Sequence, residues 1–205
     1  TVTSGAGRVY STAREFALAN GEYFSLANNS DFQAAAINGS FSFFLWLYQT
    51  NPTTAHYVIN KSTAGATATA EYRLLTSTSE NDILRFSMAD GSAVVTVSSD
   101  KSFTENQWHS IYCGYDAVRA QPFIQIDNNA IQYPGVETIL PQDTTADFHL
   151  GIPTPSFPHL AWNGRIGPVG FWHRLLTPDE TGLSQIGLTY DQIKNSSSRP
   201  WMDTP

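Results

Sequence analysis

The segment Phe41-Ser42-Phe43-Phe44-Leu45-Trp46-Leu47-Tyr48 decides the fold class of this chain. In an extended backbone, successive side chains point to opposite faces. The odd-numbered side chains of this segment are all apolar, and the even-numbered ones are aromatic from position 44 onward. A strand that is apolar on both faces lies in the centre of a sheet, with protein on either side of it. We therefore expect a central strand over Ser40–Gln49 in a fold of more than one layer.

Other segments show one of two patterns. Gln107–Tyr115 is also apolar on both faces, which indicates a second central strand. In Ile83–Met88 and Pro122–Asp127, apolar side chains alternate with polar ones, as is typical of a strand with one face open to water. Two stacked sheets explain both patterns.

Turn signals separate these segments. The dipeptides Asn20-Gly21, Asn38-Gly39 and Asp90-Gly91 tolerate the left-handed backbone of tight turns. Between the turns, β-branched and aromatic residues predict further strands over Glu22–Ala27, His56–Lys61, Glu71–Thr76, Ala93–Ser98, Ala130–Tyr133, Asp147–Gly151 and Gly164–His173. The sequence therefore predicts an all-β fold, a two-sheet antiparallel sandwich.

One short helix is predicted near the C-terminus. The motif Thr177-Pro178-Asp179-Glu180 combines a Thr N-cap, a Pro at the first helical position and a Glu three residues after the cap. A further helical turn is expected over Phe32–Ile37, after a capping motif that begins at Ser30. We assign residues 1–193 to a single domain and the Ser-rich residues 194–205 to a tail or linker.

Composition excludes several classes of function. The 205 residues are 41% hydrophobic and only 14% charged, with 18 acidic and 11 basic residues and no basic cluster. A nucleic acid is therefore not an expected partner. No apolar run approaches the roughly 18 residues of a membrane helix, so we expect no membrane insertion. The single cysteine, Cys113, lies in an apolar run and is interpreted as a small buried side chain.

The order of these segments resembles a known family, the laminin-G-like, concanavalin A-like jelly rolls. The resemblance is carried by Glu22–Leu26, Phe41–Leu47, Gln107–Asp116, Ile124–Asn129, Phe148–Gly151 and Asn163–Trp172. It implies a jelly-roll sandwich of two antiparallel sheets with a short helix after the last long strand. It does not imply one function, because lectins, glycan-binding modules, glucanases and adhesion domains share the fold.

Catalytic motifs are missing from the sequence. The glucanases of this superfamily carry a Glu-x-Asp-x-x-Glu strand, whose carboxyl groups act as nucleophile and acid/base. The nearest match here, Glu80-Asn81-Asp82-Ile83-Leu84-Arg85, ends in an arginine that cannot serve as the proton donor. The five histidines are scattered singly, and no nucleophile elbow or metalloprotease motif occurs. We therefore expect a protein that is not an enzyme.

Calcium is the one candidate cofactor. Laminin-G-like relatives often hold a calcium ion at a loop on the sheet rim, and Asp116 and Asp127 are the acids predicted to lie there. A simpler interpretation of Asp127-Asn128-Asn129 is a hairpin turn without metal.

A glycan site needs an aromatic face for the sugar C–H groups and polar groups for its hydroxyls. The best match is Trp162 and Asn163 with His159, after a proline-rich loop; Tyr72 and Arg85 are the candidates on the wet face of a sheet. Trp162 as a core residue is the alternative. If it binds sugar, Trp162→Ala should lose glycan binding and still fold.

Three hypotheses about function follow. The first is a non-catalytic recognition module that binds a glycan or a glycoprotein surface, as part of a larger secreted, cell-surface or virion protein. The second is a structural or attachment domain of an assembly such as a phage particle, which contacts other subunits. The third is a glycoside hydrolase or lyase. The expected location is extracellular, at a cell surface or on a virion.

Overall fold

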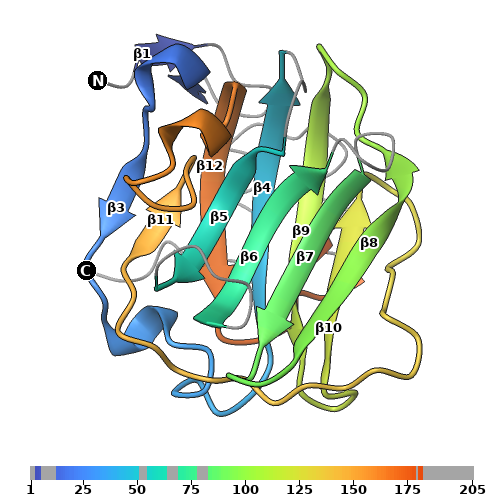
Figure 1. Ribbon diagram of the computed structural model, residues 1–205. Helices are drawn as coiled ribbons and strands as arrows, with labels where there is room; N and C mark the ends of the chain where they lie inside the picture. The colour runs from blue at the N-terminus through green and yellow to red at the C-terminus, as the bar shows by residue number, and fades with distance from the viewer. Residues whose placement is uncertain are drawn as a thin grey trace, which may run out of the picture.

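The computed structural model describes residues 3–5, 13–50, 55–63, 69–77, 83–178 and 180–181. These residues form two six-stranded antiparallel sheets that pack face to face, with β5 to β8 of one sheet in front of β12, β4, β9 and β10 of the other (Figure 1). The predicted all-β sandwich is confirmed. Within these residues, no helix is long and apolar enough to cross a membrane.

Sheet A has the order β1-β2-β12-β4-β9-β10 and sheet B the order β3-β11-β5-β6-β7-β8. The strands of sheet A are β1 (Thr3–Gly5), β2 (Ala13–Phe16), β12 (Gly164–Trp172), β4 (Phe41–Gln49), β9 (Trp108–Asp116) and β10 (Gln121–Ile126). Those of sheet B are β3 (Phe24–Leu26), β11 (Phe148–Leu150), β5 (Tyr57–Ser62), β6 (Ala70–Ser77), β7 (Ile83–Ala89) and β8 (Val94–Ser102). Short 3₁₀-helices lie at η1 (Leu18–Asn20), η2 (Ser30–Phe32) and η5 (Pro158–Leu160).

The central position predicted for β4 is confirmed, since the strand lies between β12 and β9. Its odd-numbered side chains are fully buried in the core between the sheets. On the opposite face, Phe44 and Trp46 pack with Tyr112, Phe123 and other apolar side chains in a second cluster. Both faces of sheet A are therefore covered at this place.

The segment after β12 supplies the cover on the outer face of sheet A. The Ser42 hydroxyl donates to the Arg174 carbonyl at 2.8 Å, and the Leu176 N–H donates to the Tyr112 hydroxyl oxygen at 2.9 Å. Leu176 also joins the second apolar cluster. The chain is thus fastened across β4 and β9 after it leaves the sheet.

The predicted capping box is confirmed. The Glu180 N–H donates to the Thr177 hydroxyl at 3.3 Å, and the Thr177 N–H donates to the Glu180 carboxylate at 2.8 Å. The Arg174 guanidinium donates two further hydrogen bonds to Glu180, at 2.6 and 2.8 Å. Glu180 therefore holds both the start of the helical turn and the segment before it.

Some sequence predictions are wrong or untested. The expected strand Ala130–Tyr133 forms only an isolated bridge at Gln132, and Pro134 directly after it has no N–H to extend a ladder. Strand β2 was not predicted, because its two central residues, Arg14 and Glu15, are both polar and break the alternation of apolar and polar side chains. Strand β1 was not predicted either. The helical turn predicted over Phe32–Ile37 is misplaced: the 3₁₀-helix η2 covers Ser30–Phe32, with Asn29 as its N-cap. The predicted tail 194–205 lies outside the described residues.

Cys113 lies on β9 with no exposed surface, as predicted. Burial raises the pKa of its thiol. The thiol is therefore kept protonated and unreactive by its place in the core.

A buried ion pair fastens two loops to the end of sheet B. Lys61 and Glu71 have fully buried side chains, and their Nζ and Oε1 atoms are 2.8 Å apart. The Lys61 ammonium also donates to Asn28 Oδ1 at 2.7 Å and to the Ala146 carbonyl at 2.8 Å. The same Glu71 oxygen accepts the Thr144 N–H at 2.6 Å. Each charge is thus paired and hydrogen-bonded, as burial requires.

We expect Lys61→Met to lower the free energy of unfolding by about 3–5 kcal/mol, because it leaves the Glu71 carboxylate buried without a counter-charge. Urea denaturation measures this difference. Arg119→Met is the control, since the Arg119 side chain is 59% exposed beside Asp116 and should cost at most about 1 kcal/mol. A comparable loss in both variants would contradict the assigned role of Lys61.

The Arg174–Glu180 pair should make stability depend on pH. Hydrogen bonds from the Arg174 guanidinium lower the pKa of Glu180 from 4.5 to about 2. A lowered carboxyl pKa stabilises the folded state above the unfolded pKa, and this contribution is lost as pH falls from 4.5 to about 2. The stability difference between the native chain and Glu180→Gln should therefore shrink over that range in urea titrations. An unchanged difference would disprove the coupling, and Arg174→Gln should reproduce the effect.

Candidate functional site

Trp162 does not have the exposed ring that the glycan hypothesis required. Its side chain is fully buried in the core, and its ring meets Phe103 edge-on with centroids 6.0 Å apart. The backbone N–H of Trp162 donates to the Gly151 carbonyl at 2.7 Å. A ring with no open face cannot stack on a sugar, so the expected binding role is corrected to the alternative, a core residue.

Tyr72 is also a core residue and not part of a wet face. Its ring packs between the sheets against Phe41 and Phe43, and its hydroxyl donates to the Phe32 carbonyl at 2.8 Å. Burial raises the pKa of this hydroxyl well above its usual value. Because side chains alternate along β6, Arg73 takes the outer face that was expected for Tyr72.

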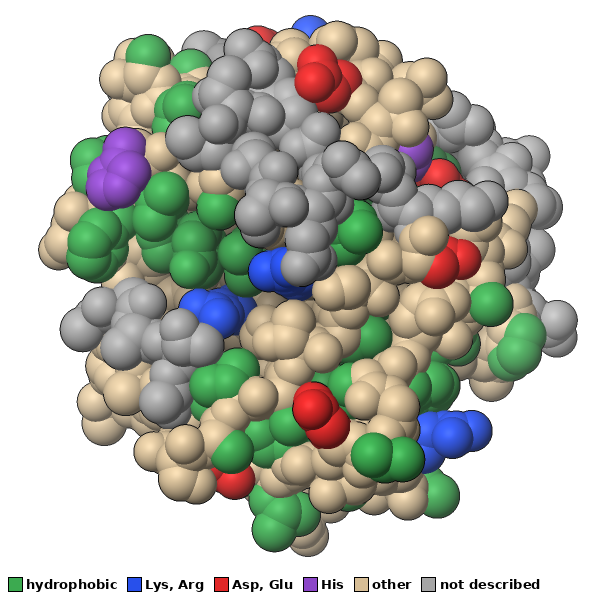
Figure 2. All heavy atoms as spheres, turned by 45° about the vertical axis from the view of Figure 1, so that its right-hand side comes forward, with side chains coloured by type: hydrophobic (Ala, Val, Ile, Leu, Met, Phe, Trp, Pro, Cys, Tyr) green, Lys and Arg blue, Asp and Glu red, His purple; other side chains and the backbone are tan. Residues whose placement is uncertain are grey.

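Arg85 lies on the outer face of sheet B, as expected. It pairs with Leu75 of β6, while Arg73 pairs with Ser87, so the two arginines are diagonal neighbours on adjacent strands. Figure 2 shows cationic side chains near the centre of this side of the molecule, among mostly uncharged groups. Arg73 and Arg85 thus place two cations close together on the outer face of sheet B.

His159 and Asn163 do not belong to the strands of sheet B that carry Arg85. His159 is exposed on η5, and Asn163 immediately precedes β12 of sheet A. The Asn163 carbonyl accepts the Thr50 N–H and hydroxyl, both at 3.1 Å. The structure therefore does not assemble the predicted site residues into one site.

Asp116 and Asp127 lie at opposite ends of the β9–β10 hairpin. Asp116 pairs with Gln121 at the turn, whereas Asp127 follows the last pair of the ladder. Five residue steps along a strand span about 17 Å, so the two carboxylates cannot share a calcium ion. Among the described residues, no three His, Cys, Asp or Glu side chains are grouped in a way that could hold a metal ion.

Each of these aspartates accepts hydrogen bonds from nearby protein groups. Asp127 accepts the His109 ring N–H at 2.8 Å and the Ser110 N–H at 2.9 Å. Partial burial raises the pKa of Asp127, but these hydrogen bonds outweigh it and lower the pKa overall. Asp116 accepts the backbone N–H groups of Val118 and Arg119, at 3.0 and 3.3 Å. The turn interpretation of Asp127-Asn128-Asn129 is supported by the Asn129 N–H, which donates to the Ile126 carbonyl at 3.1 Å.

An aromatic pair forms on the outer face of sheet A that no single motif in the sequence contains. Tyr48 is the partner of Trp108 on β9 and of Arg165 on β12, and Arg165 is the partner of Glu15 on β2. We call these four residues the Trp108 row. It crosses four adjacent strands on one face of the sheet, because directly paired residues point the same way.

The side chains of the Trp108 row contact one another. The ring centroids of Tyr48 and Trp108 are 5.5 Å apart with planes inclined by 55°. The Arg165 guanidinium lies 5.4 Å from the centre of the Tyr48 ring and 4.0 Å from the Glu15 carboxylate. Both rings are half-buried, while Arg165 and Glu15 side chains are 35% and 48% exposed. The row thus offers aromatic surface to solvent at one end and a neighbouring cation and anion at the other.

Backbone contacts at the ends of β4 and β12 place Asn163 near the Trp108 row. Asn163 is two positions before Arg165, and its carbonyl binds Thr50, two positions after Tyr48. The Asn106 N–H donates to the Gln49 carbonyl at 2.8 Å and so fastens the turn before Trp108 to the end of β4. Of the predicted site residues, Asn163 is the one that lies beside the aromatic pair.

Several proteins of known structure share this fold. Domain 4 of the extracellular arabinanase AbnA from Geobacillus stearothermophilus, in complex with arabinotriose, matches with a TM-score of 0.60 at 14% identity over 88% of this chain and 79% of that one. The binding domain of Paraclostridial Mosquitocidal Protein 1 gives 0.64 at 11% identity, over 89% and 45% of the two chains. The binding domain of botulinum neurotoxin DC in complex with rat synaptotagmin II gives 0.57 at 12% identity, over 82% and 40%. At such identities these similarities show the fold alone.

Sequence comparison supplies the family. No curated protein matches the chain. Residues 18–181, which include β3 to β12, match the sequence profile of the concanavalin A-like lectin/glucanases superfamily. The family resemblance of the sequence segments is thereby confirmed, and the chain belongs to the concanavalin A-like lectin/glucanases superfamily.

Proposed function

We propose that this domain is a non-catalytic module that binds a glycan or a glycosylated surface, as part of a larger secreted, cell-surface or virion protein. The observation that carries this proposal is the Trp108 row. Its aromatic pair, Tyr48 and Trp108, lies beside Arg165 on the outer face of sheet A, and Glu15 follows Arg165 at the end of the row.

The row has the two chemical properties that sugar recognition needs. Aromatic faces favour contact with the C–H groups of a pyranose ring, and the inclined planes of Tyr48 and Trp108 can follow a bent oligosaccharide. The Arg165 guanidinium donates hydrogen bonds and the Glu15 carboxylate accepts them, so both can bind sugar hydroxyls. Strands hold all four side chains, which reduces the ordering cost of binding.

Further observations support recognition without catalysis. Arg85 occupies the position of the acid/base in the nearest catalytic motif, and a guanidinium does not release its proton. The first two acids of that motif, Glu80 and Asp82, lie outside the described residues. Among proteins of similar fold, the arabinanase domain is described in complex with arabinotriose, and two toxin domains are described as binding domains.

A glycan array tests this function directly. The purified domain is screened with about 1 mM calcium, the range of weak extracellular calcium sites, and again with a chelator. Specific binding to a glycan class would support the proposal, and loss of binding in chelator would add a calcium requirement. No binding in either condition would overturn it.

We expect Trp108→Ala to abolish binding to an array hit while the domain stays folded, because the ring is partly exposed at the sheet surface. Tyr23→Ala is a matched control, since Tyr23 is a 38% exposed aromatic next to β3 of sheet B, and it should bind normally. Trp162→Ala should instead lower the free energy of unfolding by about 3–5 kcal/mol, as for a core aromatic. Normal binding by Trp108→Ala would exclude the row as the site.

A protein-attachment function is the second candidate, favoured by one edge of sheet B. Strand β3 is the last strand of that sheet, and its Phe24 and Leu26 side chains are 43% and 48% exposed. Apolar side chains on an open edge are typical of a contact surface. If this edge binds another subunit, Phe24→Ser with Leu26→Ser should abolish the association in light scattering of the assembly; an unchanged assembly would exclude it.

A further inference from the structure

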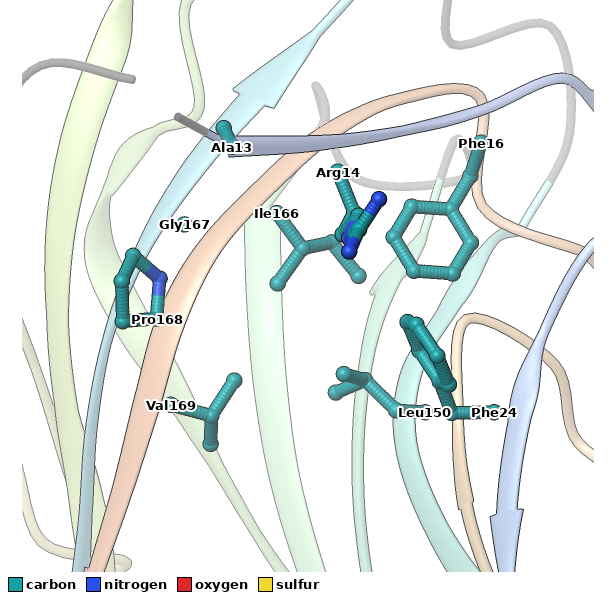
Figure 3. Close-up of a pocket in the computed structure, with 9 residues that line it drawn as sticks. All are labelled: Ala13, Arg14, Phe16, Phe24, Leu150, Ile166, Gly167, Pro168 and Val169. Atoms are coloured by element: carbon teal, nitrogen blue, oxygen red, sulfur yellow. The ribbon is translucent and has the colours of Figure 1, made fainter. Parts of the chain in front are cut away.

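A cleft opens between the two sheets at the edge of the sandwich. Its volume is about 280 Å³. Sheet A contributes Phe16, Ile166 and Val169 to its walls, and sheet B contributes Phe24 and Leu150 (Figure 3). The Phe16 and Phe24 rings meet edge-on with centroids 5.9 Å apart and close one end. The walls are therefore almost entirely apolar.

An irregularity in β12 shapes the cleft. Ile166 pairs with Leu47 and Val169 with Leu45, so Gly167 and Pro168 together stand opposite a single residue of β4. Such a bulge bends the strand, and Pro168 has no N–H for a ladder bond. A Cβ on Gly167 would approach the Cβ of Trp46 to 3.0 Å, so this position accepts little beyond glycine. The bulge at Gly167 and Pro168 in β12 therefore forms part of the cleft wall.

Arg14 is the one charged side chain in the lining. Its partner in the ladder is Ile166, a core residue, so the side chain lies on the inner face of sheet A, at the open edge of the sandwich where Arg14 is exposed. Figure 3 shows the guanidinium between Ile166 and Phe16, with Leu150, Phe24 and Val169 on the other side of the cleft. Within the described part of the chain, the guanidinium has no hydrogen bond or ion pair. A cation at an apolar cleft favours an anionic ligand group.

We propose that this cleft binds a small monocarboxylate with an apolar body, such as an acyl chain or an aryl ring. The carboxylate pairs with the Arg14 guanidinium, and the apolar body lies between Phe24, Leu150 and Val169. A few polar groups in an apolar cleft are the usual pattern of a small-ligand site. The cleft volume approaches the roughly 300 Å³ at which such sites begin and exceeds the roughly 150 Å³ of a cavity that holds benzene.

This site is independent of the glycan proposal. Arg14 and Glu15 are neighbours on β2, so their side chains point to opposite faces of sheet A. The cleft faces sheet B, and the Trp108 row faces away from it. A substitution in one site can therefore be tested without altering the other.

The probe for this proposal is octanoate, titrated into the ¹⁵N-labelled domain and followed by chemical shifts, with octan-1-ol as the uncharged match. Octanoate should shift signals of Arg14, Leu150 and Val169 and should bind about tenfold more tightly than octan-1-ol, because of the charge-assisted hydrogen bond. Arg14→Gln should weaken octanoate binding about tenfold and leave octan-1-ol binding unchanged. Arg119→Gln removes the same charge elsewhere and is the control.

Val169→Phe tests the location, because the larger ring fills the cleft; it should abolish binding of both probes in a variant whose thermal unfolding shows a folded domain. Absence of saturable octanoate binding would overturn the proposal. Equal binding of the two probes, or equal effects of Arg14→Gln and Arg119→Gln, would overturn the role of Arg14. Shifts confined to residues outside the cleft would overturn the site.

Discussion

The structure depends on the burial of both faces of β4. Its inner side chains form the core with sheet B, and Phe44 and Trp46 on its outer face need a second cover. That cover comes from the segment after β12, held by Tyr112 and Ser42. Removing large aromatic side chains from water is strongly favourable, so this segment is energetically part of the sandwich.

The cover extends over only one end of the outer face, and this creates the candidate glycan site. Near Phe44 and Tyr112 the aromatic side chains are buried by Leu176, whereas Tyr48 and Trp108 at the other end are half-exposed. The same aromatic character that requires a cover in one place thus offers a binding surface in another. Arg165 adds the polar group that a plain apolar patch would lack.

The few charged residues of this chain have distinct physical roles. Lys61 with Glu71, and Arg174 with Glu180, fasten loops or segments through paired hydrogen bonds. Arg14 instead lines an apolar cleft. It forms no ion pair with another described residue, so its charge does not stabilise the fold in this way. Because Arg14 is exposed and lines this cleft, its charge is accessible to an anionic ligand group.

The sequence by itself determined the fold class, the approximate limits of the long strands, the central place of β4 and the capping box at Thr177. Each of these depends on side-chain periodicity or on contacts between residues close in the chain. Tyr72 and Trp162 show what it could not determine. A shift of one residue moves a side chain to the other face of a sheet. Tyr72 was assigned to the outer face, which its neighbour Arg73 occupies instead. Only the tertiary structure decided which strands pair, and thereby joined Glu15, Arg165, Tyr48 and Trp108 in one row, because their alignment depends on the register between segments far apart in the chain.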